Sequence, residues 1–313
     1  MTRSSAPEPS RDNDTADETA APHDTLPCVL SFNASDPTGA GGVVSDAMVI
    51  ASIGAHALPV MTGAYVRDTR EIMGHASLGD DAVAEQAGAV AEDIPLHAIK
   101  IGFVGSAEAV AAIAAFVSDY PAVPVVAYMP DLSWWSEDEI DNYLDAFREL
   151  LLPQVAVLVG NNTTLRHWLL PESTTDRRAR ATDLARAAGE LGVSYVLVTG
   201  IPAVGDQLGN VLASAQGELF SQSYERIDAG FLGAGDILSA ALTALIATGS
   251  ELTEAVAEAL QYLDQALDHG FRPGMGRAVA DRLFWAESDD ADSADDDAPP
   301  SFDIPHPFNE TKH

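Results

Sequence analysis

Short apolar runs alternate with longer helical patterns through the middle of the chain. The apolar runs have the length and the flanking turn residues of buried strands. They are CVLSFNA (28–34), HALPVMTGAYV (56–66), LHAIKIGFV (96–104), VPVVAYM (123–129), VAVLVG (155–160) and SYVLVTG (194–200). Helices are expected between them at 43–54, 81–94, 106–120, 137–152 and 181–192. Continuously apolar strands that alternate with helices predict an α/β fold with a mostly parallel sheet sandwiched by helices.

The domain organisation follows from where this alternation begins and ends. The chain has 313 residues, 47% of them hydrophobic, which is enough for a full α/β core. Neither an internal repeat nor a Pro-rich linker interrupts residues 28–286, so one domain is predicted there. Residues 1–27 are rich in Ser, Pro, Asp and Glu, and 287–313 begin with the acidic run ESDDADSADDDAPP. Both ends are predicted to be disordered tails, because such segments bury little apolar surface.

The charge balance excludes some classes of partner. The net charge is -32 at pH 7, and lysine occurs only at Lys100 and Lys312. Nucleic acid and anionic membranes both require a basic surface, so neither is an expected partner. The single cysteine, Cys28, excludes an internal disulfide. Without a signal peptide or an apolar run approaching about 18 residues, the sequence predicts a cytoplasmic location.

A first glycine-rich turn, SDPTGAGG (35–42), follows the first predicted strand and precedes a predicted helix. Glycines there allow the backbone to approach a ligand closely, although many such turns only reverse the chain. The turn lacks the Gly-Lys-Ser/Thr ending of a P-loop. Asp46 lies about one turn into the following helix, where it could be an ordinary exposed carboxylate.

A second glycine-rich turn contains Gly233, Ala234 and Gly235 and leads into the apolar helix expected at 236–248. Backbone amides at a helix N-terminus, together with the helix dipole, form an anion-binding site. Asp236 stands at the mouth of that site. Two interpretations are open: an N-cap for the helix, or a general base beside an anion.

Several segments resemble one family when they are taken in order. GAGD (233–236) is similar to the signature of ribokinase-like kinases. ASDPTGAGGVVSDAMVIASIGAHALPVMTGAYVRDT, AIKIGFVGSAE, RELLLPQVAVLVGN, YVLVTG and GMGRAVADRLFW resemble the hydroxymethylpyrimidine/phosphomethylpyrimidine kinases of thiamine biosynthesis, and divergent proteobacterial members in particular. The resemblance covers about residues 28–286. It implies a single ribokinase-like domain with three α/β/α layers, and ATP and Mg²⁺ as cofactors.

The reaction that the resemblance implies is phosphoryl transfer to the hydroxymethyl group of the pyrimidine, and then to its monophosphate. Such transfer depends on positioning and charge stabilisation more than on covalent help. Gly233, Ala234 and Gly235 would hold the developing negative charge, and Asp236 would take the hydroxyl proton. Many pyrimidine kinases have cysteine at this last position.

Five residues fall where the family contacts the pyrimidine ring. Asp46 would recognise the amino edge of the ring, with Ala34 and Gly41 nearby. Phe103 would stack on the ring or wall it, unless it is simply a core aromatic residue. Arg67 replaces the usual glutamine and cannot accept a hydrogen bond, so it would meet the phosphate of the monophosphate or indicate a different ligand.

The nucleotide and metal side departs further from the family pattern. Tyr128 replaces an aspartate at the end of the fourth strand, and Asp131 is the candidate metal ligand in its stead. Asn161 is kept and Thr199 replaces a lysine, both on the ATP side. Thr164 replaces an acidic residue of the metal and phosphate network. Several uncompensated losses of this kind would slow catalysis by orders of magnitude.

Two alternatives therefore accompany the pyrimidine kinase. One is a pyridoxal-type kinase of the same fold, since Arg67 alters the ring contact. The other is a catalytically impaired pyrimidine-binding protein that kept the GAGD turn. The family resemblance also implies a homodimer.

Overall fold

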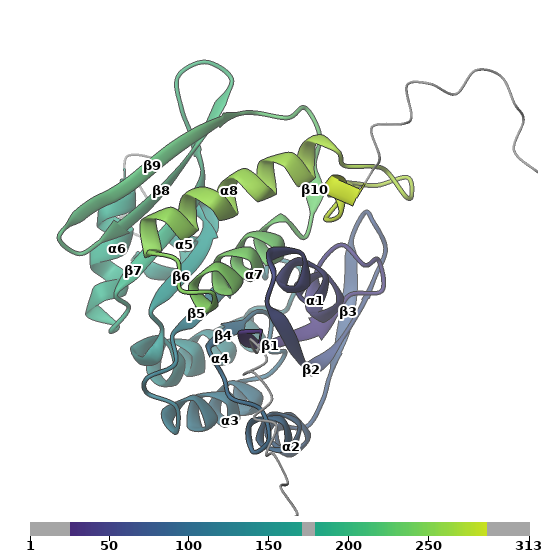
Figure 1. The fold of residues 1–313 in the computed structure, drawn as a ribbon, viewed down its shortest axis with the longest axis vertical. Helices are drawn as coiled ribbons and strands as arrows, with labels where there is room; N and C mark the ends of the chain where they lie inside the picture. Colours follow the sequence, from purple (N-terminus) through teal and green to yellow (C-terminus); the bar gives the residue numbers. More distant parts are fainter. Residues whose placement is uncertain (1–25, 171–178, 287–313) are drawn as a thin grey trace, which may run out of the picture.

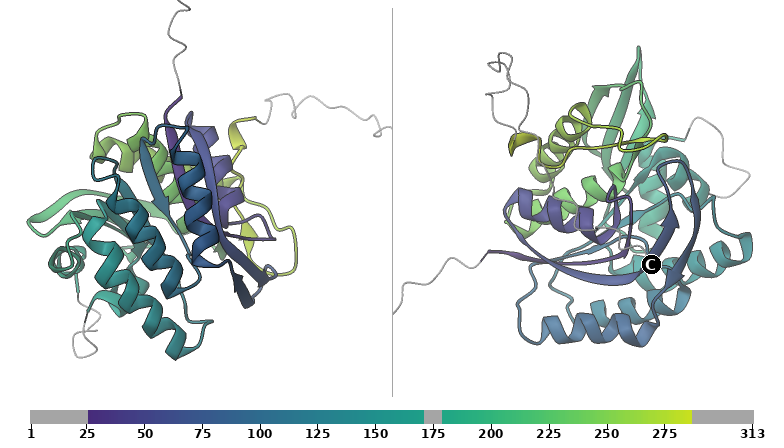
Figure 2. Two further views of the ribbon diagram at one scale, coloured as in Figure 1. Left: turned by 90° about the horizontal axis from the view of Figure 1, so that it is seen from below. Right: turned by 90° about the vertical axis from the view of Figure 1, so that its right-hand side faces the viewer.

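The computed structural model describes residues 26–170 and 179–286. The tails predicted at the two ends therefore lie almost entirely outside the described residues. Within those residues the chain forms one α/β unit, in which a central sheet separates two layers of helices (Figures 1 and 2). The predicted fold class is confirmed.

The sheet has the strand order β3-β2-β1-β4-β5-β6-β7-β8-β9 in the described part of the chain. The strands from β2 to β7 in this order are parallel, whereas β3 at one edge and β8 and β9 at the other are antiparallel. Their bounds are Cys28–Ser35 (β1), His56–Arg67 (β2), Ile72–Ser77 (β3), Ala98–Ile101 (β4), Val125–Met129 (β5), Val157–Asn161 (β6), Tyr195–Pro202 (β7), Gln207–Ser214 (β8) and Gly217–Glu225 (β9).

Helices cover both faces of this sheet (Figure 2). The first layer consists of Gly42–Ile53 (α1), Ala234–Ala247 (α7) and Leu252–Asp268 (α8). The second consists of Asp80–Ala91 (α2), Ala107–Ser118 (α3), Glu137–Ala146 (α4), Asn162–Leu169 (α5) and Ala181–Glu190 (α6). The two buried apolar clusters lie on opposite sides of the sheet, which explains why the parallel strands are apolar at nearly every position. A small sheet pairs Phe231–Leu232 (β10) with Ala278–Val279 (β11) beside the start of α7.

Helix α7 is apolar on nearly every side because it is enclosed on nearly every side. It packs against strands β1, β4, β5 and β6 and against the neighbouring helices α1 and α8. Every residue from Ile237 to Leu245 is buried. The helix begins at Ala234, two residues earlier than predicted, with Gly233 as its N-cap, and Gly249 follows its end with φ 92°. This burial fixes the N-terminus of α7 over the middle of the sheet.

Several predicted bounds differ from the structure. The helix expected at 137–152 is α4 followed by a π-helical turn, Phe147–Leu151, and a 3₁₀ turn, Leu152–Gln154. The sequence prediction omitted β3, β8 and β9, of which β3 and β9 contain no buried residue and β8 is buried mainly at its carboxyl end. It also omitted α5 and α8. None of the helices in 26–170 and 179–286 is long and apolar enough to cross a membrane.

Candidate active site

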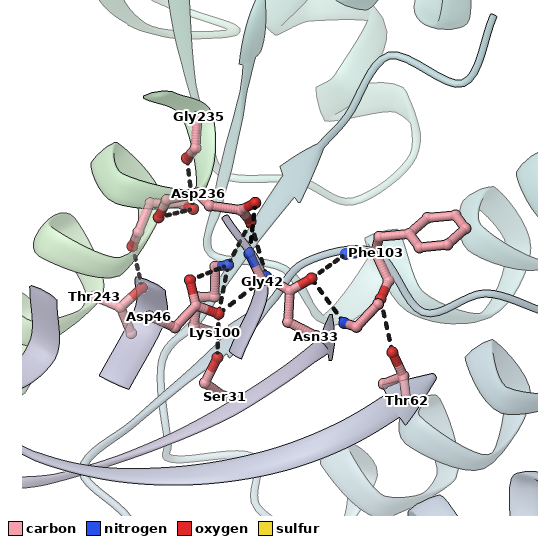
Figure 3. Close-up of polar contacts among 12 residues, drawn as sticks. Ser31, Asn33, Gly42, Asp46, Thr62, Lys100, Phe103, Gly235, Asp236 and Thr243 are labelled. Atoms are coloured by element: carbon pink, nitrogen blue, oxygen red, sulfur yellow. Dashed lines mark hydrogen bonds and ion pairs between the residues drawn. The ribbon is translucent and has the colours of Figure 1, made fainter. Parts of the chain in front are cut away.

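The carboxyl ends of β1 and β4 meet the N-terminal turns of α1 and α7, and a buried charge cluster lies at this junction (Figure 3). The ammonium group of Lys100 on β4 lies 2.8 Å from each carboxylate oxygen of Asp46 on α1. It also donates to Asp236 Oδ1 on α7 at 2.9 Å. Lys100 and Asp46 have fully buried side chains, whereas that of Asp236 is 16% exposed. One lysine therefore joins two carboxylates that are 190 residues apart in sequence.

Two side chains of β1 complete the cluster. Asn33 Nδ2 donates to Asp236 Oδ1 at 2.8 Å and to Asp46 Oδ2 at 3.0 Å. The Ser31 hydroxyl donates to Asp46 Oδ2 at 2.7 Å. The Asn33 amide is itself oriented, because its Oδ1 accepts from the backbone amides of Ala34 and Phe103. Ser31 and Asn33 point to the same face because side chains two apart on a strand do so.

The two glycine-rich turns pack directly against each other. The amide of Gly42 donates to Asp236 Oδ2 at 3.2 Å, and a Cβ on Gly41 would lie 2.6 Å from the same oxygen. Gly233 has φ 73°, and a Cβ there would lie 1.9 Å from the Ala40 carbonyl oxygen. Glycine is thus required on both sides, because backbone and carboxylate occupy the space that a side chain would need. The contact between the turns brings Asp236 to the first turn.

The pKa values of Asp236 and Asp46 are shifted in opposite directions. Burial alone would raise the pKa of Asp236, but the Lys100 ammonium and the hydrogen bonds from Lys100, Asn33 and Gly42 outweigh it and hold that pKa below the ordinary value. Burial dominates at Asp46 and raises its pKa, although Lys100 opposes the shift. Burial likewise opposes the charge of Lys100, yet the two carboxylates raise its pKa. Asp236 is therefore ionised and Lys100 protonated at neutral pH.

Tyr128, near the carboxyl end of β5, covers the start of α7. A Cβ on Gly235 would lie 2.2 Å from Tyr128 Cζ and 2.3 Å from its hydroxyl oxygen. Burial is the main reason that the pKa of Tyr128 is raised, and the charges of Asp236 and Asp131 add to it. Tyr128 is thus a neutral phenol that can donate a hydrogen bond beside the helix N-terminus.

Phe103 belongs to a cluster of aromatic rings. Its ring stacks on Tyr65 at a centroid distance of 5.2 Å and packs edge-on against His75, Trp134 and Trp135. Only 2% of Phe103 is exposed. Tyr65 stacks on one face of the Phe103 ring, and the contact with the substrate ring, by stacking or as a wall, stays a prediction. Tyr65 and Trp134, which are only partly buried, form the outer part of the cluster.

Arg67, at the end of β2, pairs with the first glycine-rich turn. Its Nη1 lies 3.4 Å from Asp36 Oδ2, and its guanidinium carbon lies 5.9 Å from the centre of the Tyr65 ring. Asp36 also accepts hydrogen bonds from the amide and hydroxyl of Thr38. A hollow of about 400 Å³ adjoins this pair, lined by Thr38, Asp68, Thr69, Arg70, Pro273, Gly274 and Met275.

The predicted nucleotide residues lie further along the same sheet edge. Asn161 and Thr199 are paired neighbours on β6 and β7. Asn161 is exposed and caps α5 by accepting from the Thr163 amide at 2.9 Å, and Thr199 Oγ1 donates weakly to the Gly160 carbonyl. Asp131 is exposed and accepts from the Ser133 amide. Across 26–170 and 179–286, no three His, Cys, Asp or Glu side chains are grouped to hold a metal.

Two interpretations of single carboxylates are corrected by these positions. Asp236 is not an N-cap, because Gly233 holds that position and the Asp236 carboxylate bonds to other elements. Asp46 is not an exposed helix carboxylate. Its two oxygens bond to Lys100, Ser31 and Asn33, and the contact with the amino edge of a pyrimidine stays a prediction. Ala34 is 1% exposed, and its contact with the ligand also stays a prediction.

Sequence reasoning missed Lys100, Asn33 and Ser31. The signal for Lys100 was present, because a lysine within an otherwise apolar strand, in a chain with two lysines, requires a buried counter-charge. Asn33 and Ser31 have the spacing of two neighbours on one strand face. Nothing in the sequence showed which helix they would meet.

A mostly parallel sheet between two layers of helices, with an ionised aspartate at the start of a buried helix above the strand ends, has the ribokinase-like fold. The model of the phosphomethylpyrimidine kinase family matches residues 36–281. The match to a family of kinases shows that the chain is a kinase. The chain belongs to that family, and the predicted family is confirmed.

Comparisons with individual proteins agree with this assignment. The chain is 28% identical over 265 residues to the hydroxymethylpyrimidine/phosphomethylpyrimidine kinase of Streptomyces coelicolor, covering 84% of this chain and 96% of that protein. It is 28% identical to a thiamine biosynthesis bifunctional protein of Geobacter sulfurreducens, covering 83% of this chain and 53% of the longer protein. In fold it is similar to an ADP complex of Bacillus subtilis pyridoxal kinase, with a TM-score of 0.74, 20% identity, and coverage of 84% and 100% of the two chains.

Proposed function

We propose that this kinase transfers a phosphoryl group from ATP to 4-amino-5-hydroxymethyl-2-methylpyrimidine and then to its monophosphate, in thiamine biosynthesis. The observation that carries the proposal is the ionised carboxylate of Asp236, held by Lys100, Asn33 and Gly42 at the first turn of α7. The family match and the name of the Streptomyces relative supply the substrate class.

The start of α7 has the chemistry of a phosphoryl-binding site. Gly233, Ala234 and Gly235 lie in or directly before its first turn, where backbone amides have no carbonyl of their own helix as acceptor. The helix dipole adds positive potential at the same place. Amides aimed at a transferring phosphoryl group stabilise the charge that develops on it, and such donors are each worth a few kcal/mol in comparable sites.

Asp236 is suited to take the proton of the substrate hydroxyl. Oδ1 already accepts from Lys100 and Asn33, so Oδ2, which has the Gly42 amide at 3.2 Å, is the oxygen left to bind a proton. The hydroxyl oxygen forms a bond to phosphorus as the bond to the leaving ADP breaks, and the hydroxyl proton passes to Asp236. Transfer to a positioned carboxylate of this kind contributes about 10²–10⁴-fold to rate.

ATP supplies the phosphoryl group, and a Mg²⁺ ion would neutralise the charge on its phosphate oxygens. Mg²⁺ keeps several waters and is commonly held by one or two carboxylates together with phosphates. Asp131, which is exposed and close enough to raise the pKa of Tyr128, fits such a single carboxylate ligand. Asn161 and Thr199, adjacent on β6 and β7, would contact ATP. Tyr128 would donate a hydrogen bond to a phosphate oxygen.

Arg67 would bind the phosphate of the monophosphate substrate. The distance of 3.4 Å between Arg67 Nη1 and Asp36 Oδ2 is long for a charge-assisted hydrogen bond. A phosphate that binds the guanidinium in a bidentate manner would be a stronger partner. Gly41, beside Asp236, would line the passage of the hydroxymethyl group. Pyridoxal is the second candidate substrate, since the arginine departs from the family pattern and a pyridoxal kinase has the same fold.

The test is ADP release by the purified chain with MgATP and, separately, the hydroxymethylpyrimidine, its monophosphate and pyridoxal. Turnover on both pyrimidines supports the proposal. A preference for pyridoxal would instead identify the second candidate as the substrate. Binding of the pyrimidine by calorimetry without turnover overturns the catalytic proposal and leaves a pyrimidine-binding protein.

We also infer a cytoplasmic homodimer that binds neither nucleic acid nor membranes. The single, unpaired cysteine supports the location. The net charge of -32 argues against binding to nucleic acid or anionic membranes. The dimer is supported by the family resemblance alone. Light scattering of the purified chain tests the dimer.

A further inference from the structure

We propose that Lys100 is a positioning residue that holds Asp236 in its proton-accepting orientation and charge state, and that Asp46 moderates this effect by competing for the same ammonium group. The inference rests on the proposed role of Asp236 as base. It assigns a function to Lys100 and Asp46, whose side chains are fully buried.

The geometry of Lys100 excludes a direct role in binding phosphate. An ammonium group has three N–H donors. Its contacts are Asp46 Oδ1 and Oδ2 at 2.8 Å each and Asp236 Oδ1 at 2.9 Å, which use all three. The side chain is also fully buried. Lys100 can therefore influence the reaction only through the two carboxylates.

The cluster opens to solvent at one member only. The side chains of Lys100 and Asp46 are 0% exposed, and that of Asp236 is 16% exposed. A proton that enters or leaves the cluster must therefore do so through Asp236. Lys100 and Asn33 hold Oδ1 from one side, so the carboxylate cannot rotate freely, and Oδ2 remains directed at the turn containing Gly41 and Gly42.

The two carboxylates compete for one positive charge. Lys100 carries one positive charge, and the carboxylates of Asp46 and Asp236 carry one negative charge each when ionised. The net charge of the cluster is then -1. Two phenols, Tyr65 on β2 and Tyr128 on β5, also interact electrostatically with Asp236. Their pKa values are raised, so they stay neutral in the acid range. Neither phenol therefore contributes to a titration in the acid range.

Opposite consequences follow for two substitutions. Lys100→Met leaves Asp236 buried beside a second carboxylate without a cation, which favours protonation of Asp236. Asp46→Asn leaves Lys100 with one anionic partner, which favours ionisation of Asp236. A purely structural role would lower activity in both variants without moving their pH profiles in opposite directions.

The experiment compares the pH dependence of kcat/KM for the wild type, Lys100→Met, Asp46→Asn and the double variant, because kcat/KM reports the free enzyme. We expect the acid limb to move to higher pH in Lys100→Met and to lower pH in Asp46→Asn. The double variant should lie between the two single variants. Asp119→Asn, an exposed carboxylate at the end of α3, is the matched control for loss of charge and should leave the limb in place.

A second readout keeps the test independent of turnover. The carboxyl resonance of Asp236, identified by its loss in Asp236→Asn, is titrated by ¹³C NMR in the wild type and in Asp46→Asn. A lower midpoint in Asp46→Asn supports the inference even if no substrate turns over, which would contradict only the proposed function. An unchanged or higher midpoint overturns it, as do acid limbs that stay fixed or move in the same direction in both single variants.

Discussion

Gly235 and Tyr128 fit together so closely that a single methyl group on Gly235 would lie 2.2 Å from Tyr128 Cζ. Gly235 lies in the first turn of α7 and Tyr128 on β5 beneath it. The glycine is thus needed for contact with the ring as well as for its proposed contact with phosphate. The residues at positions 128 and 235 are therefore coupled by packing.

This contact predicts a double-mutant result. Gly235→Ala should destabilise the protein by about 1–3 kcal/mol, because the methyl group forces the buried ring to move. In a Tyr128→Ala background the same change should be neutral or stabilising, since alanine otherwise favours helix. Urea unfolding of the four proteins measures the coupling. Equal costs of Gly235→Ala in both backgrounds would contradict the packing relationship.

A second prediction compares two glycines with similar backbone angles. Gly233 (φ 73°) and Gly249 (φ 92°) flank α7, but only Gly233 has backbone within reach of a Cβ. Gly249→Ala should cost about 1–2 kcal/mol through the left-handed backbone alone. Gly233→Ala should cost clearly more, because the methyl group also meets the Ala40 carbonyl and separates the two turns. Urea midpoints at fixed m-value test the order, and equal costs would argue against tight contact between the turns.

The lowered pKa of Asp236 predicts how acid affects stability. A carboxyl whose folded pKa lies below its unfolded value stabilises the fold above the unfolded pKa, about 3.9 for aspartate, and loses that contribution as pH falls through the folded value. The difference in unfolding free energy between wild type and Asp236→Asn should therefore shrink below about pH 4. A difference that grows on acidification would mean that the pKa of Asp236 is raised.

Arg67 should discriminate between the two pyrimidine substrates. If the guanidinium meets the phosphate of the monophosphate, Arg67→Met should raise KM for the monophosphate and leave KM for the unphosphorylated pyrimidine nearly unchanged. Loss of one charge-assisted contact of this kind is typically worth about 1.5–3 kcal/mol, or about 10- to 150-fold. Steady-state kinetics with both substrates provides the measurement. Equal increases in KM would indicate that Arg67 only supports the turn through Asp36.

The sequence was most informative where burial is continuous. The parallel strands and α7 are mainly apolar, so their existence and the place of GAGD at the sheet edge could be predicted. Strands β8 and β9 were missed because neither has a long continuous apolar run, and β9, at the edge of the sheet, largely alternates between exposed and half-buried residues. The π-helical turn after α4 has no recognisable sequence signal.

The site was only partly predictable for a different reason. Asp236 and its glycines are contiguous, and their position was clear. The partners of Asp236 come from β1, β4 and α1, and which of these elements meet depends on strand order, a property of the whole chain. Asp46 illustrates the limit, since a carboxylate on a helix has the same appearance in sequence whether it faces solvent or a buried lysine.

The most direct measurement is kcat for ADP formation by the wild type and Asp236→Asn, with saturating MgATP and the hydroxymethylpyrimidine. Asparagine keeps the size and one oxygen of aspartate but cannot accept a proton. We expect a fall in kcat of about 10²–10⁴-fold, with ATP affinity largely retained. Turnover by Asp236→Asn at close to the wild-type rate would contradict the assignment of Asp236 as the base.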